Sequence, residues 1–461
     1  MRIRISILLL VAIVAIVAGC SDDSSSPQND GPASFGKMMG SHTHETVVTG
    51  AAVLSDGTRV ACGDFDGFLH VTGSPDSIAA GGAARNFLAE FKPDGSLLKA
   101  VQIAGGAVGM RRMARDRDDN LVLVGTFAGT STFGNVSIPA VNGDMIFAKV
   151  DRNGNVIFVH SGSGTGLDQG MDVATASDGS IYLTGIASSE MTVGGEDVGQ
   201  TGHATGFLVK LGSNGVGVWQ QTAGTTGGTT CDGVAVSEDG TVIACGEYNG
   251  GNVDFSGDVL TNDGGADSFI GRFEADGTPL GSIHIGGTDD QVARDVTTLD
   301  SDVIVTGTFS GIADFDVDSA GGNITASGDG NAFVARYTKS GSLRWVKTFG
   351  PGDKQTGRGV ARLSGGRILV CGEFLTTITL GSKTFTSNGT TDVFIARLDG
   401  NGNVLSASQL GGAGSDETTT AVTTGRTAIV VGSTESGQVI FPDGSRHNEF
   451  GPVDGYLFQE P

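Results

Sequence analysis

Three aspartates alternate with other residues at Asp314, Asp316 and Asp318, the spacing of the first ligands in a calcium-binding loop. Calcium takes roughly six to eight oxygen ligands, and carboxylates supply them well. Such a loop also needs a glycine at its sixth position and an acid at its twelfth, where this chain has Ser319 and Thr325. The sequence therefore predicts no resident cofactor, and calcium at the three aspartates stays open as an alternative.

A second set of acids occupies one shared position, directly before an apolar segment that recurs along the chain. Its members are Asp144, Asp267, Asp392 and Asp454. Carboxylates at a shared position could form a ring of cation ligands. An aspartate before a strand also commonly accepts hydrogen bonds from nearby loop amides. We expect the local role, and we keep the four residues as part of a candidate binding face.

Basic residues supply a third candidate site, for an anion. One position, near the start of the first strand predicted in each repeat, should lie at the mouth of a central channel. It is occupied by Thr49, Arg112, Met171, Asp232, Arg294, Arg358 and Thr420. Guanidinium groups bind carboxylates and phosphates through paired hydrogen bonds, so Arg112, Arg294 and Arg358 could hold an anion. We expect pairing with neighbouring acids instead.

The chain contains no sequence motif of a catalytic site. We find no nucleophile elbow and no metalloprotease helix, and the glycine-rich Gly162–Gly166 is not followed by a helical pattern, which a phosphate loop requires. The sequence therefore predicts no catalytic residue. Whether the protein is an enzyme stays open, with a non-enzyme favoured.

All these positions are defined by an internal repeat. A glycine ends one apolar segment at intervals of 60 to 65 residues, and an apolar residue opens the next segment in the same phase. The glycines are Gly63, Gly125, Gly185, Gly246, Gly307, Gly372 and Gly432. The apolar residues are Phe87, Ile146, Phe207, Phe269, Phe333, Phe394 and Tyr456. Each repeat contains four short segments separated by Asp-Gly or Asn-Gly turns, which indicates four antiparallel strands.

Repeats of this length favour an all-β, seven-bladed β-propeller with four antiparallel strands per blade. The last repeat stops after its third strand. Ser34–Met39 has the spacing of the missing fourth strand, so we expect the N-terminal strand to join the last blade and close the ring. The predicted domain therefore spans residues 34–461. The long connections between second and third strands contain apolar pairs five residues apart, which indicates extra hairpins on the face where binding is expected.

The repeats resemble those of bacterial β-propeller repeat (SBBP-like) proteins. The matching segments are Asp392 to Leu398, with the sequence DVFIARL, and Asp178 to Gly185, with the sequence DGSIYLTG. The resemblance covers the whole predicted domain and implies an extracytoplasmic location. Its motifs describe turns and core positions, so it implies no activity.

The N-terminus has the pattern of a bacterial lipoprotein signal. Arg2 and Arg4 precede an apolar run that is too short to span a bilayer and that ends at Val17-Ala18-Gly19-Cys20. We predict a signal peptide over residues 1–19 and lipid attachment at Cys20. Residues 20–33 contain the lipidated cysteine and a polar tether. The expected location is the cell envelope: the outer membrane, the cell surface or the periplasmic side of the inner membrane.

Charge and cysteine usage complete the prediction. The chain has a formal net charge of −23 at pH 7, which argues against nucleic acid as a partner. Cys62, Cys245 and Cys371 occupy one repeat position and are expected to be small buried residues, while pairing of Cys231 with Cys245 stays open. We expect a membrane-anchored binding or scaffold protein whose partner is a protein or an envelope polysaccharide. The alternatives are a propeller hydrolase or lyase at the long-loop face, and a purely structural envelope protein.

Overall fold

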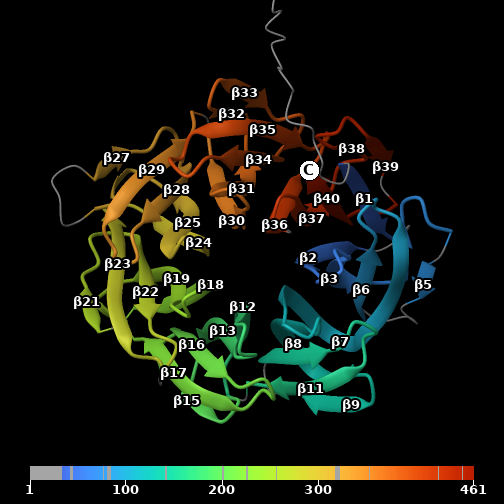
Figure 1. Cartoon of the computed structure of the whole chain (residues 1–461), viewed down its shortest axis with the longest axis horizontal. Helices are drawn as coiled ribbons and strands as arrows, with labels where there is room; N and C mark the ends of the chain where they lie inside the picture. The colour runs from blue at the N-terminus through green and yellow to red at the C-terminus, as the bar shows by residue number, and fades with distance from the viewer. Residues whose placement is uncertain are drawn as a thin grey trace, which may run out of the picture.

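The computed structural model describes residues 34–41, 45–75, 77–79, 85–140, 143–162, 164–199, 202–224, 227–255, 257–316, 322–351, 353–423, 425–448 and 450–460. The predicted signal peptide and tether therefore lie outside the described residues. The described part of the chain is built of β-strands arranged around a central axis, which is a β-propeller fold (Figure 1). It contains no helix long and apolar enough to cross a membrane.

Each sequence repeat contributes four successive antiparallel strands, and the first of them lies nearest the axis (Figure 1). The first strands are β2 (Thr46–Val53), β7 (Leu97–Arg115), β12 (Gln169–Thr175), β18 (Thr229–Val236), β24 (Gln291–Leu299), β30 (Gln355–Leu363) and β36 (Asp416–Thr423). The second strands are β3 (Arg59–Phe65), β8 (Leu121–Phe133), β13 (Ile181–Ala187), β19 (Val242–Asn249), β25 (Asp302–Phe309), β31 (Arg367–Phe374) and β37 (Ala428–Thr434).

The two outer strands complete each repeat. The third strands are β6 (Arg85–Phe91), β10 (Asp144–Val150), β16 (Thr205–Leu211), β22 (Ala266–Phe273), β28 (Asn331–Tyr337), β34 (Asp392–Leu398) and β40 (Asp454–Glu460). The fourth strands are the first part of β7, then β11 (Val156–Ser161), β17 (Gly217–Ala223), β23 (Pro279–Gly287), β29 (Leu343–Phe349), β35 (Val404–Leu410) and β1 (Phe35–Gly40).

The repeat markers found in the sequence pair directly with one another. The glycine that ends each second strand lies opposite the apolar residue that opens the third strand. The pairs are Gly63–Phe87, Gly125–Ile146, Gly185–Phe207, Gly246–Phe269, Gly307–Phe333, Gly372–Phe394 and Gly432–Tyr456. The repeated nature of the chain and the phase of the repeats are therefore confirmed.

The prediction of seven blades with four strands in each is wrong, because the repeats do not form seven separate four-stranded sheets. The described strands form six sheets of four or more strands, and only three of these have four strands. β7 runs without a break from one repeat into the next and joins two repeats into one eight-stranded sheet. Two other sheets reach six strands because each adds a short hairpin from the repeat that follows. A count of repeats cannot show where a strand continues across the junction between them.

The ring closes through the N-terminal strand, as the sequence predicts. β1 is antiparallel to β40, with Phe35 opposite Gln459 and Met39 opposite Gly455. The observed strand, Phe35–Gly40, is shifted by one residue from the predicted Ser34–Met39. This pairing gives the last repeat its fourth strand and covers an edge that would otherwise expose unpaired backbone groups.

Extra hairpins connect the second and third strands, as the apolar pairs indicated. They are β4 (Phe68–Val71) with β5 (Ser77–Ala79), the end of β8 with β9 (Val136–Pro139), β14 (Met191–Val193) with β15 (Glu196–Val198), β20 (Val253–Phe255) with β21 (Asp258–Leu260), β26 (Ile312–Asp314) with β27 (Asn323–Thr325), β32 (Thr377–Leu380) with β33 (Lys383–Thr386), and β38 (Gln438–Ile440) with β39 (Arg446–Asn448). Several hairpins also pair with the fourth strand of the preceding repeat, for example Asp314 with Gly286 and Met39 with Val71. The hairpins therefore connect neighbouring repeats.

Basic side chains on the third strands form a second connection between repeats. Each donates a hydrogen bond to a backbone carbonyl in the outer turn of the following repeat. The bonds are Lys149 to Ser213 at 3.2 Å, Lys210 to Ala275 at 2.7 Å, Arg272 to Lys339 at 2.6 Å and Arg336 to Gly400 at 2.7 Å. These residues are therefore engaged in the scaffold.

The hydrophobic core lies between neighbouring repeats, since each cluster of buried side chains draws on two or more of them. β1 contributes to two clusters at once. Met38 packs against Tyr456 and Val430, whereas Met39 belongs to the cluster that contains Phe65. Both methionines are fully buried. The closing strand is thus held by side chains on both of its faces.

Truncation of either methionine is expected to destabilise the whole ring. Met38→Ala and Met39→Ala should each lower the free energy of unfolding by about 2–4 kcal/mol, because each leaves a cavity in a separate core cluster. Chemical denaturation followed by tryptophan fluorescence measures the effect. Lys37→Ala, at a half-buried position of the same strand, is the matched control and should change the value by less than about 0.5 kcal/mol. Equal effects at all three positions would contradict this account of β1.

Candidate functional site

Every first strand contains one residue that the pairing with the second strand skips. The register passes from Val48 to Gly50 in β2, and the same shift recurs in each repeat. The skipped residues are Thr49, Arg111, Met171, Asp232, Arg294, Arg358 and Thr419. A residue skipped in this way is a β-bulge, which bends the strand and redirects the local side chain.

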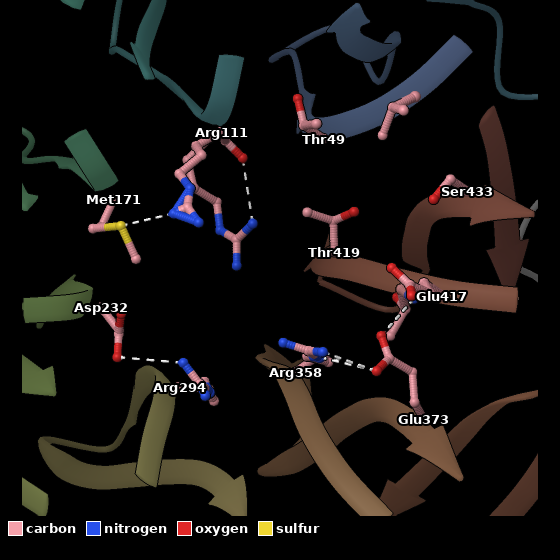
Figure 2. A pocket seen from close by; sticks show the side chains of 13 residues that line it. Thr49, Arg111, Met171, Asp232, Arg294, Arg358, Glu373, Glu417, Thr419 and Ser433 are labelled. Carbon is pink, nitrogen blue, oxygen red and sulfur yellow. Dashed lines mark hydrogen bonds and ion pairs between the residues drawn. The ribbon is translucent and has the colours of Figure 1, made fainter. Parts of the chain in front are cut away.

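The bulged residues surround an open cavity of about 310 Å³ at one mouth of the central channel. Its lining consists of Val47, Thr49, Arg111, Arg112, Met171, Asp232, Arg294, Arg358, Glu373, Glu417, Thr418, Thr419 and Ser433. Figure 2 shows these side chains arranged around a free centre, with Arg111 and Met171 facing Thr49, Thr419 and Ser433 across it. The volume is at the lower end of the range for small-ligand sites.

Six of the seven residues predicted for the channel mouth line this cavity. The exception is Thr420, which lines a second cavity farther along the channel. Arg112 lines both cavities, and its neighbour Arg111 is the bulged residue. The distance from the repeat glycine could have corrected both assignments. Arg111 precedes Gly125 by 14 residues, the same separation as between Thr49 and Gly63.

Two of the four arginines at the mouth have a carboxylate partner in the same cavity. Nη1 of Arg294 lies 3.8 Å from Oδ2 of Asp232. Nε and Nη2 of Arg358 donate to Oε2 of Glu373 at 3.1 and 3.0 Å. Burial raises the pKa of both Asp232 and Glu373, although the neighbouring arginines oppose that rise.

Arg111 differs from these two arginines. Its Nη1 lies 2.8 Å from the thioether sulfur of Met171, a weak acceptor, and no carboxylate of the described residues lies within 4.0 Å of its guanidinium. Burial lowers the pKa of Arg111, and the positive charge of Arg112 adds to that effect. The cavity thus contains one guanidinium that is exposed to it and has no acidic counterpart.

Arg112 closes the inner end of the cavity. It belongs to the residues that directly follow the bulges, which line the second cavity, of about 330 Å³. Nε of Arg112 lies 3.9 Å from Oδ1 of Asp172. Asp172 and Asp295 each accept a backbone amide from another first strand, that of Val234 and that of Val360, both at 2.8 Å. Burial raises the pKa of both aspartates.

The acids that precede the third strands lie in separate repeats, and the structure does not bring them together. Asp392 accepts hydrogen bonds from the amide of Asn388 and the hydroxyl of Ser387, at 3.2 and 3.0 Å. Asp267 accepts the amide of Asp263, and Asp454 accepts that of Phe450. Asp144 is buried in the equivalent position. These contacts are those of residues that fix the loop before a strand.

The predicted calcium ligands are described only in part. Oδ1 of Asp314 accepts the amide of Asp316 at 2.9 Å, while Asp318 lies outside the described residues. Asp263, Asp267 and His284 form a group whose potential ligand atoms lie within 4.8 Å of one another. Nε2 of His284 lies 3.3 Å from Asp267 and 3.0 Å from the hydroxyl of Tyr248.

The position of His284 explains this group without a metal. His284 lies opposite Phe269, and Gln409 holds the same place opposite Phe394. The side-chain amide of Gln409 donates to Asp392, the counterpart of Asp267. His284 therefore stands where another repeat uses an amide donor to the loop-fixing carboxylate, and the group is not assigned as a metal site.

The cysteines are buried thiols behind the channel wall. Cys62, Cys231, Cys245 and Cys371 are all free, so Cys231 and Cys245 do not form a disulfide. Burial raises the pKa of each thiol. None of them lines either channel cavity.

Comparison with known proteins identifies related folds only. No family model matches the chain, and no curated protein matches it, so the resemblance to the bacterial β-propeller repeat family stays a prediction. The chain is similar to the WD40 β-propeller domain of Doa1, with 10% identity, a TM-score of 0.47, and coverage of 92% of this chain and 95% of that one. A virginiamycin B lyase from Staphylococcus aureus, solved with quinupristin, gives 10% identity and a TM-score of 0.42, over 92% and 99% of the two chains. YCF48 bound to D1 peptide gives 8% identity and a TM-score of 0.41, over 91% and 93%.

Asp64 stands behind the cavity and has a strongly shifted ionisation. Its Oδ1 accepts hydrogen bonds from the side-chain amide of Asn86 and from the amide of Met110, which directly precedes the bulged Arg111. Glu373 similarly accepts the amide of Thr418, which precedes the bulged Thr419. Burial raises the pKa of Asp64 to about 7.

Stability should therefore depend on pH through Asp64. An unfolded aspartate has a pKa of about 3.9, so the folded protein resists ionisation of Asp64 and this contribution to stability falls as pH rises from about 4 to about 7. Asp64→Asn keeps an oxygen that accepts both hydrogen bonds and removes the titration. Urea unfolding at several pH values should show the variant gaining on the wild type by on the order of 2 kcal/mol between pH values of about 4.5 and 7.5. A difference that does not change with pH would refute the assignment.

Proposed function

We propose that this protein is a lipid-anchored binding protein of the bacterial cell envelope, and that its ligand enters the channel mouth. The observation that carries the proposal is the open cavity ringed by bulged residues, in which Arg111 has no acidic partner. The bulged residues interrupt the ladder without supporting it, so their side chains are free to serve recognition. The family resemblance and the N-terminal signal pattern support an extracytoplasmic location.

Binding is favoured over catalysis by the chemistry of the cavity. No histidine or cysteine is among the described residues that line it. Two of its three carboxylates, Asp232 and Glu373, are engaged by arginines. A hydrolase or lyase needs an acid, base or nucleophile placed to act on a substrate, whereas these groups are placed to hold one.

Blocking the mouth should abolish ligand capture. Met171→Trp fills the cavity from a bulged position, while Thr297→Trp adds the same ring at the other end of the channel and is the matched control. Immobilised wild-type protein and both variants would be incubated with envelope extracts, and the retained glycans and proteins identified by mass spectrometry. We expect material held by the wild type and by Thr297→Trp to be lost with Met171→Trp.

Two outcomes would count against a ligand at the mouth. Retention of the same material by Met171→Trp would move binding to another surface. Capture of nothing by the wild type would favour a purely structural role. Circular dichroism and the melting temperature of each variant establish that the fold is intact.

Lipid attachment is tested at Cys20. Cys20→Ser should shift the protein from the membrane fraction to the soluble fraction, because a single acyl-bearing residue is the proposed anchor. Metabolic labelling with a fatty-acid analogue should mark the wild type and leave the variant unmarked. Cys62→Ser changes a buried thiol and is the control. Membrane association of Cys20→Ser equal to that of the wild type would contradict lipid anchoring.

A further inference from the structure

The cavity at the channel mouth has the composition of a site for a singly charged anion. It contains four arginines and three carboxylates, in a protein whose overall formal charge is −23. Arg111 has no carboxylate within 4.0 Å, and Nε of Arg294 is buried without a hydrogen-bond partner among the described residues. Buried donors are nearly always satisfied, so an unmatched one at a cavity indicates a group that the ligand supplies.

The carboxylates of the cavity select among anions. A phosphate group with two charges would be repelled by Asp232, Glu373 and Glu417. A carboxylate has one charge and a planar shape that matches the paired donors of a guanidinium. The acids then have a second use, since each can accept a hydrogen bond from a ligand hydroxyl.

The wall that faces Arg111 favours a ligand with several hydroxyl groups. Thr49, Thr419, Ser433 and Glu417 lie on that side of the mouth (Figure 2). Hydroxyl and carboxylate oxygens there offer acceptors and donors at several points around one small volume. No aromatic ring is among the described residues of the lining, so recognition would depend on hydrogen bonds and charge.

From these features we infer that the channel mouth binds a polyhydroxylated carboxylate, of the chemical class of the sugar acids. This inference rests on the proposed function and names its ligand class. The ligand carboxylate contacts Arg111 and Nε of Arg294, and its hydroxyls contact Thr49, Thr419 and Glu417. A cavity of about 310 Å³ holds one such unit. The unit is either a free sugar acid or one residue of an acidic polysaccharide.

Calorimetric titration of the purified full chain tests the inference with defined probes. D-glucuronate and D-galacturonate are compared with D-glucose, D-galactose and inorganic phosphate, and a galacturonate trimer distinguishes the two sources. At least one uronate should bind ten times or more tighter than its neutral counterpart and than phosphate. Tighter binding of the trimer indicates a polysaccharide, and equal binding a free sugar acid; both support the inference.

Two variants locate the site. Arg111→Met keeps the apolar part of the side chain and removes its charge, and it should weaken uronate binding at least tenfold. Arg362→Met makes the same change in the second cavity and should bind like the wild type. Preferential binding of phosphate, equal binding of neutral sugars, or unchanged binding by Arg111→Met would overturn the inference. If no uronate binds while Met171→Trp still abolishes capture from envelopes, the ligand class is wrong and the proposed function stands; if Met171→Trp captures the same material as the wild type, both are wrong.

Discussion

The bulge in each first strand is the constraint from which the rest of the channel follows. It pushes the carbonyl of a residue such as Val47 against the glycine that ends the second strand, here Gly63. A side chain at that glycine would collide with the carbonyl, and the same contact recurs in every repeat. The glycines that mark the repeat in the sequence are thus required by the bulges. The bulges in turn direct seven side chains to the channel mouth.

A second regularity fills the space behind the channel wall. Where the residue after the bulge is a glycine, as at Gly50, Gly233 and Gly359, the second strand has a cysteine. In the other repeats the residue after the bulge has a side chain, and the second strand has valine or threonine: Val124, Thr184, Thr306 and Val431. The sulfur of Cys62, Cys245 or Cys371 lies where the missing Cβ of the glycine would be. The cysteines are therefore packing residues, matched to the backbone opposite them.

The sequence predicted much of this structure because its signals are local and periodic. Turn glycines, alternating strands and apolar pairs identified the strands, the hairpins and the closing role of β1. Two features were out of reach. Continuation of β7 across a junction depends on contacts between repeats, so the division into sheets was wrong. The bulge skips one residue, so the positions given to Arg112 and Thr420 were displaced by one from Arg111 and Thr419, although the spacing to the repeat glycine contained the correction.

The place where β1 enters the ring has a consequence for orientation. Phe35 lies against Gly95, and its partner Gln459 donates to the carbonyl of Pro93, so the strand begins at the face formed by the tight turns. The first strands run from the cavity toward those same turns, which puts the cavity on the opposite face. With the proposed acyl anchor only a short stretch before Ser34, the turn face would be held toward the bilayer. The arginine-lined opening would then look outward, away from the lipid, toward whatever diffuses or is displayed beyond the membrane.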